Sequence, residues 1–314
     1  MTDSKPAYSY LGPPGTFTEA ALAQVPEAQG AVWHPVSNVG EALDDVVSGR
    51  SVAAMIAIEN SIDGGVSVTQ DALANIPGLR IRGEYLVPVR FDLVALPGTQ
   101  LDEIAVIAAH PVAYGQSYTK LNALLPKHAH LPASSNVAAV AELSTDGPAQ
   151  AAVGPHGIAS RYDVQVLAED IGEHANALTR FVLVGRPGPV PPPTGADKTS
   201  LIAELPQDRS GALQELLEQF STRGVNLSLL ASRPIGDALG RYRFIIDADG
   251  HILEERVADA LLGLKRFSPN VIFLGSYPRA DRTPVVVPPQ YADEVFIEAR
   301  DWLRGLIAGE PVTE

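Results

Sequence analysis

The chain has 314 residues, of which 46% are hydrophobic and 19% are charged, a composition typical of globular proteins and unlike that of disordered or fibrous chains. Its 37 acidic and 23 basic residues give a formal net charge of −14, which disfavours nucleic acids and anionic membranes as partners. There is no cysteine, so disulfides, thiolate nucleophiles and cysteine-bound metals are excluded.

Short apolar runs alternate with helical patterns up to residue 185. The predicted strands are residues 8–11, 52–58, 86–96, 104–108, 149–153 and 178–184, and the predicted helices lie near residues 17–25, 39–48, 112–125 and 136–144. This alternation is typical of an α/β domain with largely parallel, buried strands. Thr16 and Glu19 have the spacing of a capping box for the first helix, and Gly49 suits the end of the second.

A segment with five prolines and three glycines, residues 185–198, marks a domain boundary because it disfavours both helix and central strand. After it, strands are predicted at residues 199–205, 225–234, 240–247 and 271–275, and helices at residues 211–222 and 252–265. This βαββαβ order predicts a ferredoxin-like domain, in which one face of a four-stranded antiparallel sheet carries both helices. An amphipathic helix in the tail is expected to pack on the body or on a partner subunit.

Three polar loops carry the candidate chemistry. GPPGTF at residues 12–17 lacks the spacing of a nucleotide-binding loop, so it is either a plain turn or a turn that presents backbone N–H groups to an anion. IENSIDGGV at residues 58–66 ends a strand, where ligands often bind in α/β sheets, although Asn and Ser are also ordinary turn residues. In NALTRF at residues 176–181, the adjacent Thr179 and Arg180 should project to opposite faces of a strand.

Together these loops resemble the prephenate dehydratase family. GPPGTF is similar to its N-terminal signature, IENS to its central signature and TRF to its activity signature, in the expected order and spacing. The resemblance extends through HP at residues 110–111, SSNVAAV at residues 134–140 and GPHGIASRYDVQVLAEDI at residues 154–171, and so covers residues 7–185. Pro14 departs from the family, in which glutamate is usual at this position.

The resemblance implies an α/β, two-lobed, periplasmic-binding-protein-like catalytic domain at residues 7–185. Lobe 1 is expected at about residues 7–80 and 165–185, and lobe 2 at about residues 81–164. The active site should lie in the cleft between the lobes, and a linker at residues 186–198 should follow.

The implied reaction is the decarboxylating dehydration of prephenate to phenylpyruvate, water and carbon dioxide in phenylalanine biosynthesis. The barrier lies in expelling hydroxide, and the resemblance assigns help with this step to Thr179 as the catalytic residue. A threonine hydroxyl is too weak an acid to give up its proton outright at neutral pH, so we interpret it as a hydrogen-bond donor in a preorganised site. No cofactor is expected, because the reaction involves neither redox chemistry nor group transfer.

Substrate contacts are expected from all three loops and from the SSN segment. The guanidinium of Arg180 suits a bidentate contact with one carboxylate, the N–H groups near Gly15 and Thr16 suit the second, and Phe181 should pack beneath the site. The expected substrate-binding residues are Gly15, Thr16, Asn60, Ser61, Ser135, Asn176, Arg180 and Phe181. Glu59 is either an acid with a raised pKa or a structural carboxylate that accepts backbone N–H groups.

The second predicted domain, residues 199–278, resembles the ACT regulatory module of the same family, and residues 279–314 form a tail. The motifs are SGAL at residues 210–213, GVNL at 224–227, SRP at 232–234 and LGSYP at 274–278, with Ser210 and Ala231 in place of the usual proline and glutamate. The resemblance implies a homodimer or homotetramer in which paired copies hold an amino acid at their interface, with phenylalanine as the expected effector. The expected effector-binding residues are Gly211, Ala212, Leu213, Asn226, Leu227, Ser232, Arg233 and Pro234.

Several classes of function are disfavoured. The histidines His110, His128, His130, His156 and His174 do not have metal-ligand spacing, so no metal site is expected. The N-terminal residues are not an apolar leader and no apolar stretch approaches 18 residues, which predicts a cytoplasmic protein. Two alternatives stay open, an arogenate dehydratase and a non-catalytic amino-acid-responsive binding protein, and the intact TRF motif argues against the second.

Overall fold

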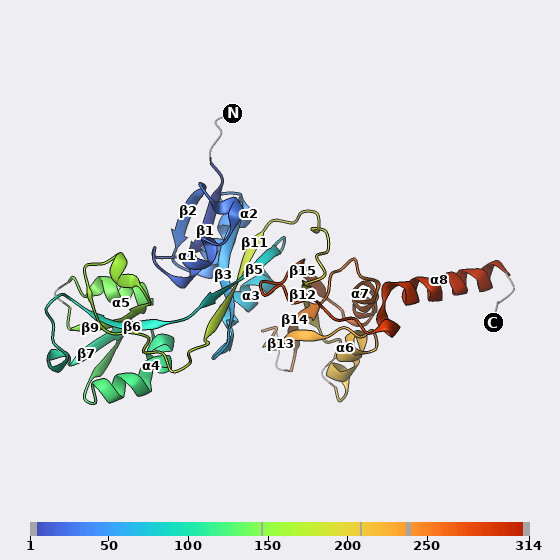
Figure 1. Ribbon diagram of the computed structural model, residues 1–314. Helices are drawn as coiled ribbons and strands as arrows, with labels where there is room; N and C mark the ends of the chain where they lie inside the picture. Colours follow the sequence, from blue (N-terminus) through green and yellow to red (C-terminus); the bar gives the residue numbers. More distant parts are fainter. Residues whose placement is uncertain (1–4, 146, 208, 237–239, 310–314) are drawn as a thin grey trace. The chain divides into compact units, whose positions relative to one another are not determined.

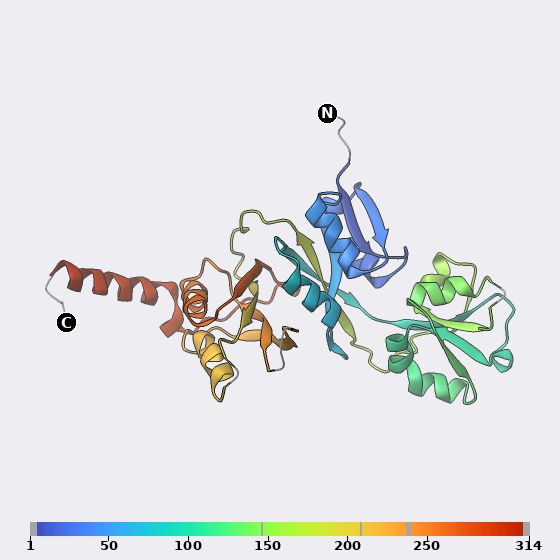
Figure 2. The same ribbon diagram turned by 180° about the vertical axis from the view of Figure 1, so that it is seen from behind.

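The computed structural model describes residues 5–145, 147–207, 209–236 and 240–309. The chain forms two compact units, one made of residues 1–69 and 85–183 and the other of residues 70–84 and 184–314. Figures 1 and 2 show the chain from opposite sides. None of the described helices is long and apolar enough to cross a membrane.

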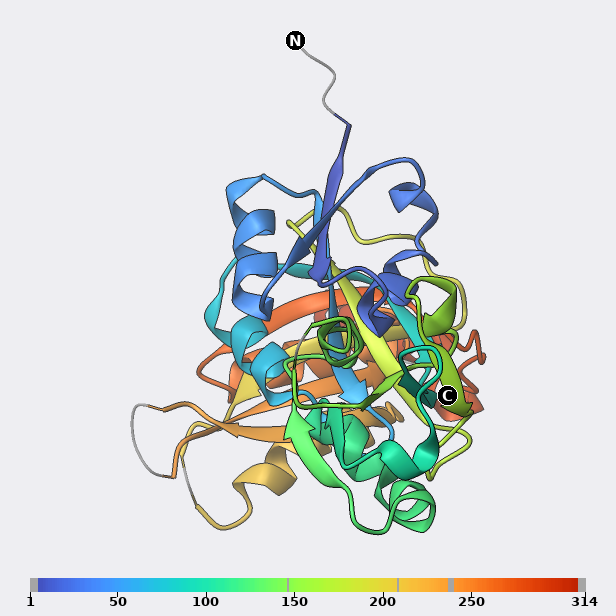
Figure 3. The ribbon, with the colours of Figure 1, turned by 90° about the vertical axis from the view of Figure 1, so that its left-hand side faces the viewer.

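The first sheet contains the N-terminal strands and the strand that carries the TRF motif. Its strands are β1 (Ala7–Leu11), β2 (Val32–Val36), β3 (Ala53–Asn60), β5 (Arg80–Pro88) and β11 (Leu178–Gly185), in the order β2-β1-β3-β11-β5, and the short β4 (Gly64–Gly65) pairs with β3. β1 is parallel to β2 and to β3, which requires crossover connections through α1 (Phe17–Leu22) and α2 (Val39–Ser48). In Figure 3 these two helices lie on opposite sides of β1, as expected for a parallel sheet that is buried on both faces.

The second sheet is mixed. Its strands are β6 (Phe91–Ala95), β7 (Val106–Ala109), β8 (Ala129–Pro132), β9 (Ala151–Pro155) and β10 (Gln165–Ala168), in the order β10-β6-β9-β7-β8. β7 is parallel to β8 and β9, whereas β6 is antiparallel to β9 and β10. The helices α4 (Pro111–Leu124) and α5 (Asn136–Glu142) follow β7 and β8. Short 3-10 helices are η1 (Pro26–Ala28), η2 (Leu101–Glu103), η3 (Ile158–Ser160) and η4 (Pro289–Tyr291).

The third sheet belongs to the C-terminal unit and is antiparallel throughout. Its strands are β12 (Asp197–Glu204), β13 (Leu227–Pro234), β14 (Tyr242–Asp249) and β15 (Val271–Pro278), in the order β13-β14-β12-β15. With α6 (Ala212–Ser221) and α7 (Glu255–Phe267), the predicted βαββαβ order is confirmed. Leu216, Phe220, Val257 and Leu264 of the helices pack with Phe244 of the sheet in one buried core.

Two helix ends test the predicted capping. Thr16 caps α1 as predicted, because its Oγ1 accepts the Glu19 N–H at 3.4 Å. The predicted reciprocal bond is different, since the Glu19 carboxylate accepts the N–H of Gly15 at 2.7 Å and not that of Thr16. The prediction for Gly49 is confirmed, because it ends α2 with a φ of 81° in the left-handed region.

Several predicted boundaries were wrong. The single strand predicted at residues 86–96 is divided between β5 and β6, which belong to different sheets. The edge strands β2, β8 and β10 were not predicted, and neither was α3 (Ser67–Asn75). Helix α3 begins in one compact unit and ends in the other, because the boundary between the units falls after Thr69.

The predicted tail helix is α8 (Asp293–Ala308), which extends away from α6 and α7 in Figure 1. Its N-terminal part contacts α7, because Asp293 Oδ1 accepts the Glu255 N–H at 2.8 Å and Arg300 pairs with the Glu255 carboxylate. Trp302 and Leu303 are more than half exposed, so this part of the helix does not pack on the body of the chain.

Candidate active site

The residues of the TRF and IENS motifs meet where β11 and β3 lie side by side. Asn60, the last residue of β3, donates its side-chain N–H to Thr179 Oγ1 at 3.0 Å. The Asn60 Oδ1 atom accepts the backbone N–H groups of Ile62 and Asp63 at 2.8 and 3.2 Å, which fixes the orientation of the amide. Because Thr179 Oγ1 accepts from Asn60, its own O–H can donate in another direction.

Thr179 lines a cavity of about 360 Å³ in the N-terminal unit. An adjoining cavity of about 260 Å³ shares with it Phe17, Ala57, His110, Asn136 and Thr179. Ala57 and Thr179 lie on strands of the first sheet and Phe17 begins α1. His110 and Asn136 stand at the starts of α4 and α5, which follow strands of the second sheet. The two cavities therefore form one candidate site, with Thr179 at the junction.

Several polar side chains line this site, and the carboxylate among those of the described residues is that of Asp63. His110 caps α4, its Nδ1 accepts the Val112 N–H at 3.3 Å, and burial lowers the pKa of its imidazole. The buried Asn136 Oδ1 has no hydrogen-bond partner among the described residues. Gln116 donates to the Asp63 carboxylate at 2.6 Å. No lysine or arginine is among the described residues that line the two cavities.

An apolar wall completes the site. The rings of Phe17 and Phe91 meet edge to face, with their centroids 5.8 Å apart, and both line the larger cavity together with Val89. Phe181 is 2% exposed and lines the smaller cavity, as does Ala57. This wall lowers the local dielectric, which strengthens hydrogen bonds from nearby donors.

Five of the nine residues expected at the catalytic site line these cavities: Thr16, Asn60, Ser135, Thr179 and Phe181. Thr16 and Ser135 are also helix caps, since Thr16 Oγ1 accepts the Glu19 N–H and Ser135 Oγ accepts the Ala138 N–H.

The other four residues are placed differently. The Gly15 N–H is occupied by the Glu19 carboxylate, and Asn176 is exposed. Ser61 exchanges hydrogen bonds with the backbone of Leu178, accepting its N–H on Oγ at 3.0 Å and donating its own N–H to the Leu178 carbonyl at 2.9 Å.

Thr179 and Phe181 line the cavities and Arg180, between them on β11, does not, in agreement with strand alternation. The Arg180 Nε is 3.2 Å from the Glu59 carboxylate, and Arg180 is 6% exposed. This ion pair joins the residue before Asn60 to the residue after Thr179. The pair thus links β3 and β11 one residue along each strand from the Asn60–Thr179 hydrogen bond.

Sequence reasoning did not single out His110, Gln116, Asn136 or Asp63 as site residues. His110 and Asn136 stand in the HP and SSN segments that carried the family resemblance, and this was the signal that could have identified them. Gln116 follows His110 by six residues along α4, and no local pattern distinguishes it from a surface glutamine.

The expected effector-binding residues lie on three segments of the C-terminal unit. Gly211 to Leu213 begin α6, and Asn226 and Leu227 begin β13, where Asn226 donates to the Asp249 carboxylate at 2.7 Å. The SRP residues lie at the far end of β13, roughly 16–23 Å along the strand from Leu227. One chain therefore does not bring Asn226 and Leu227 together with the SRP residues.

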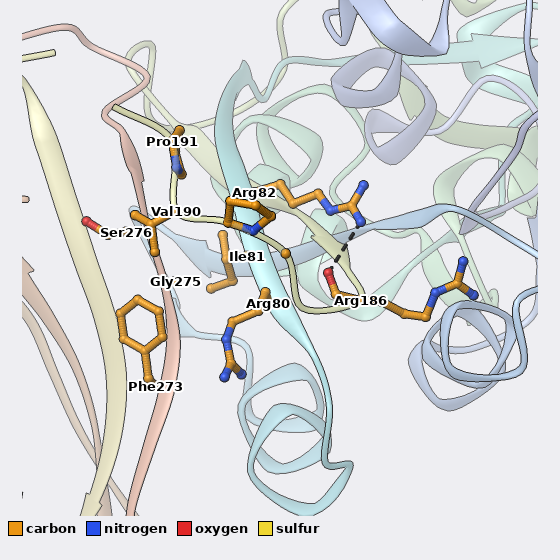
Figure 4. Close-up of a pocket in the computed structure, with 11 residues that line it drawn as sticks. Arg80, Ile81, Arg82, Arg186, Val190, Pro191, Phe273, Gly275 and Ser276 are labelled. Carbon is orange, nitrogen blue, oxygen red and sulfur yellow. Dashed lines mark hydrogen bonds between the residues drawn. The ribbon is translucent and has the colours of Figure 1, made fainter. Parts of the chain in front are cut away.

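A further cavity of about 350 Å³ lies in the C-terminal unit between the beginning of β5, the proline-rich segment and β15. Three arginines line it, but in Figure 4 the side chains of Arg80, Arg82 and Arg186 point in different directions. Arg82 donates to the Arg186 carbonyl at 3.3 Å, and Arg80 lies over the Phe273 ring, 5.3 Å from its centroid. The guanidinium groups thus do not converge on one anion. Across the described residues, no three His, Asp or Glu side chains gather as a metal site would require.

Comparisons with known proteins agree on one family. The model of the family described as prephenate dehydratase matches residues 8–189. A prephenate dehydratase from Mycolicibacterium vanbaalenii is 40% identical, with 98% of this chain and 100% of that protein covered. A prephenate dehydratase from Mycobacterium tuberculosis is also 40% identical, over 96% of this chain and 94% of that protein. The solved structure of prephenate dehydratase from Arthrobacter aurescens in complex with L-Phe is similar with a TM-score of 0.91 and 49% identity, covering 96% of this chain and 99% of the other.

Proposed function

The chain belongs to the prephenate dehydratase family and converts prephenate to phenylpyruvate in phenylalanine biosynthesis, and we propose that this reaction takes place in the cavity lined by Asn60 and Thr179. The observation that carries the proposal is the 3.0 Å hydrogen bond from Asn60 to Thr179 Oγ1, which joins two of the family motifs at a cavity. We further propose that the two sheets of this unit are the two lobes of a periplasmic-binding-protein-like catalytic domain.

The reaction breaks two bonds and forms an aromatic ring. The bond between the ring and its carboxylate breaks, carbon dioxide leaves, and the electron pair becomes part of the ring. The C–O bond at the opposite ring carbon breaks, and the hydroxide leaves as water after taking up one proton. The products are strongly favoured because the ring becomes aromatic, so the enzyme must mainly assist departure of the hydroxide.

Thr179 is placed to give that assistance. Its oxygen accepts from Asn60, so its proton points away from Asn60 and can donate to the departing hydroxyl. Thr179 is 8% exposed, and a hydrogen bond in such a dry, preorganised setting stabilises developing negative charge more strongly than one in water. Asn60 acts as a positioning residue for this donor.

The two carboxylates of the substrate are proposed to meet different surroundings in the cavity. We propose that the carboxylate that is retained binds to neutral donors, the hydroxyl of Ser135 and the amide of Asn136, since no cation lines the two described cavities. The carboxylate that is lost would face the apolar wall formed by Phe17 and Phe91. Poor solvation there disfavours the charged ground state relative to neutral carbon dioxide.

Arg180 we assign to positioning rather than to direct contact with the substrate. Its ion pair with Glu59 fixes the ends of β3 and β11, which carry Asn60 and Thr179. We therefore assign the Glu59 carboxylate a structural role, as the ion-pair partner of Arg180.

The C-terminal unit is proposed to be an ACT domain that senses phenylalanine. Its βαββαβ order and its SGAL, GVNL and SRP segments support this, as does the complex of the Arthrobacter aurescens relative with L-Phe. Asn226 and Leu227 lie at the opposite end of β13 from the SRP residues, so we propose a homodimer or homotetramer in which both copies supply effector residues.

Incubation of the purified protein with prephenate, without added cofactor, tests the proposal. Formation of phenylpyruvate is the expected result, and a rate equal to that of the uncatalysed reaction would overturn it. A parallel incubation with arogenate, followed by measurement of phenylalanine, distinguishes prephenate dehydratase from arogenate dehydratase.

A further inference from the structure

Two arginines oppose each other on the third sheet. Arg233 on β13 and Arg243 on β14 are directly paired in the strand register, so they share one face of the sheet. Phe244 and Ile246 belong to the core under α6 and α7, so the arginines lie on the opposite face. Like charges directly across a strand pair are unfavourable unless other groups compensate for them.

Helix α3 supplies the compensating groups. Asp71 accepts from Arg233 in a bidentate ion pair, with Nε to Oδ1 at 2.9 Å and Nη2 to Oδ2 at 2.6 Å. Asn75 Oδ1 accepts from Arg243 Nη1 at 2.9 Å. Because Asp71 and Asn75 are four residues apart, they project from one side of the helix toward the two arginines. The Arg233 guanidinium also lowers the pKa of Asp71, so this carboxyl is ionised at neutral pH.

The segment that follows α3 is attached to the same sheet. Lys198 of β12 lies 3.0 Å from the Glu84 carboxylate, and both side chains are buried. A Cβ atom on Gly275 of β15 would lie 2.3 Å from the Ile81 carbonyl oxygen, so only glycine permits this approach, which Figure 4 shows between β5 and β15. Residues 70–84 thus have a defined position on this sheet, and the Asp71–Arg233 pair is a partly exposed attachment.

The other end of α3 adjoins the catalytic cavity. Asp63, Gly64, Gly65 and Val66 line that cavity, and Ser67, the next residue, begins α3. A shift of α3 along or about its axis therefore changes the positions of cavity residues through the chain itself, without requiring any further contact.

We propose that the Asp71–Arg233 ion pair is a regulatory latch that the carboxylate of the amino-acid effector opens by competing with Asp71 for Arg233. This inference rests on the proposed function, in which Arg233 belongs to the SRP segment that binds phenylalanine. The effector carboxylate has the same chemistry as the Asp71 side chain, so one guanidinium fork binds one or the other. Opening the latch removes one attachment of α3, which lets the helix shift and alters the cavity loop.

Reciprocity gives the latch a distinctive signature. If phenylalanine must displace Asp71, the intact pair opposes phenylalanine binding, and removing Asp71 must strengthen binding while it removes the effect on catalysis. A variant that merely damaged the effector site would bind more weakly. The pair is partly exposed, 26% for Arg233 and 40% for Asp71, so we expect a change of roughly 3- to 10-fold in Kd.

The test uses the full chain with the substitution Asp71→Asn and L-phenylalanine as the ligand. Calorimetry should give a Kd roughly 3- to 10-fold below that of the wild type, and the rate of phenylpyruvate formation should no longer depend on phenylalanine. Asp163→Asn is the matched control, because Asp163 is exposed and its substitution removes the same charge. This variant should bind phenylalanine and respond to it as the wild type does. An unchanged Kd together with an unchanged response in Asp71→Asn would overturn the latch.

A second variant acts in the opposite direction. Asn75→Asp places a carboxylate opposite Arg243, strengthens the attachment of α3 and should raise the Kd for phenylalanine several-fold. A lower Kd in this variant would contradict the latch.

Hydrogen exchange separates the latch from the proposed catalytic function. Phenylalanine should speed amide exchange in residues 67–76 of the wild type, and Asp71→Asn should show that faster exchange without ligand. If the wild type forms no phenylpyruvate, the proposed function fails while binding and exchange still decide on the latch. If the wild type forms phenylpyruvate but binds no phenylalanine, the latch is overturned.

Discussion

Asn60 donates a hydrogen bond to Thr179 Oγ1 at 3.0 Å across 119 residues of sequence. The contact joins the ends of two neighbouring strands, and because the threonine oxygen is the acceptor, its own proton can be donated elsewhere. One residue along each strand, the Arg180–Glu59 ion pair ties together the same two strands. Together the two contacts fix the position of the Thr179 hydroxyl.

Removing the donor while keeping the side-chain shape tests this arrangement. Thr179→Val should lower kcat by roughly 10²-fold or more, because the departing hydroxide loses its hydrogen bond, while the fold is retained. Steady-state kinetics with prephenate and a circular dichroism spectrum measure the two effects. Near-normal turnover in a folded variant would contradict the role of Thr179.

Arg180→Lys distinguishes positioning from substrate contact. The sequence alone predicted a rise in KM, because lysine keeps the charge but loses the bidentate fork. With Arg180 paired to Glu59 and not lining the cavities, we now expect a lower kcat and a lower melting temperature with little change in KM. Glu59→Gln should reproduce this pattern. A large rise in KM for Arg180→Lys alone would instead indicate that Arg180 contacts the substrate directly.

Edge strands show why part of the first unit could not be predicted from sequence. β2 contains His34 and Pro35, and β8 ends at Pro132, so neither has the apolar, β-branched pattern of a strand. Both lie at an edge of their sheet, where the missing N–H of proline is tolerated. The central strands β1, β3 and β9 are apolar and were found because burial on both faces imposes that pattern.

Helix α3 was missed for a related reason. Its buried side chains include Thr69 and Gln70, and its polar residues Asp71 and Asn75 meet arginines from a distant part of the chain. No apolar stripe results, so periodicity gives no helical signal. The stabilising partners are visible only in three dimensions.

The catalytic motifs were more predictable than their surroundings. Thr179 and Asn60 could be recognised because they occupy motifs with fixed order and spacing. Asn136 and Gln116 reach the same cavity from α5 and α4, and only the folded arrangement of the sheets brings them there. The alternation rule correctly placed Thr179 and Arg180 on opposite faces of β11, although it could not say which of them faces the cavity.

Asp45 gives the first sheet a defined dependence on pH. Burial by itself would raise the pKa of its carboxyl, but hydrogen bonds from Ser9 at 2.6 Å, Arg50 at 2.6 Å and His34 at 3.0 Å outweigh burial, and the pKa is lowered. A lowered pKa in the folded state means that the stabilisation is complete above the ordinary carboxyl range and is lost as the pH falls through the folded-state pKa.

Asp45→Asn should therefore lower the free energy of unfolding by about 1–3 kcal/mol at neutral pH. It should also flatten the fall in stability on acidification below about pH 4. Urea unfolding followed by the fluorescence of Trp33, which lies on β2, measures both. Asp44→Asn is the matched control, because Asp44 is exposed and should change little. Equal stability loss at neutral and acidic pH would show that the charge of Asp45 does not matter.

Gly211 tests the proposed effector site. It precedes α6 with a φ of 84°, and a Cβ atom there would meet nothing within 4 Å. Gly211→Val is therefore strained by its backbone conformation and not by a clash, and we expect the turn at the start of α6 to change shape. Because this turn belongs to the proposed effector site, phenylalanine binding should be lost.

Calorimetry should accordingly detect no binding heat in Gly211→Val, and phenylalanine should no longer alter its rate. The rate without phenylalanine should stay near that of the wild type, since Gly211 does not line the catalytic cavities. Gly309→Val introduces the same strain at a φ of 76°, also in open space, and should leave the response intact. A full phenylalanine response in Gly211→Val would place the effector elsewhere, whereas loss of the response in both variants would attribute it to general destabilisation of the C-terminal unit.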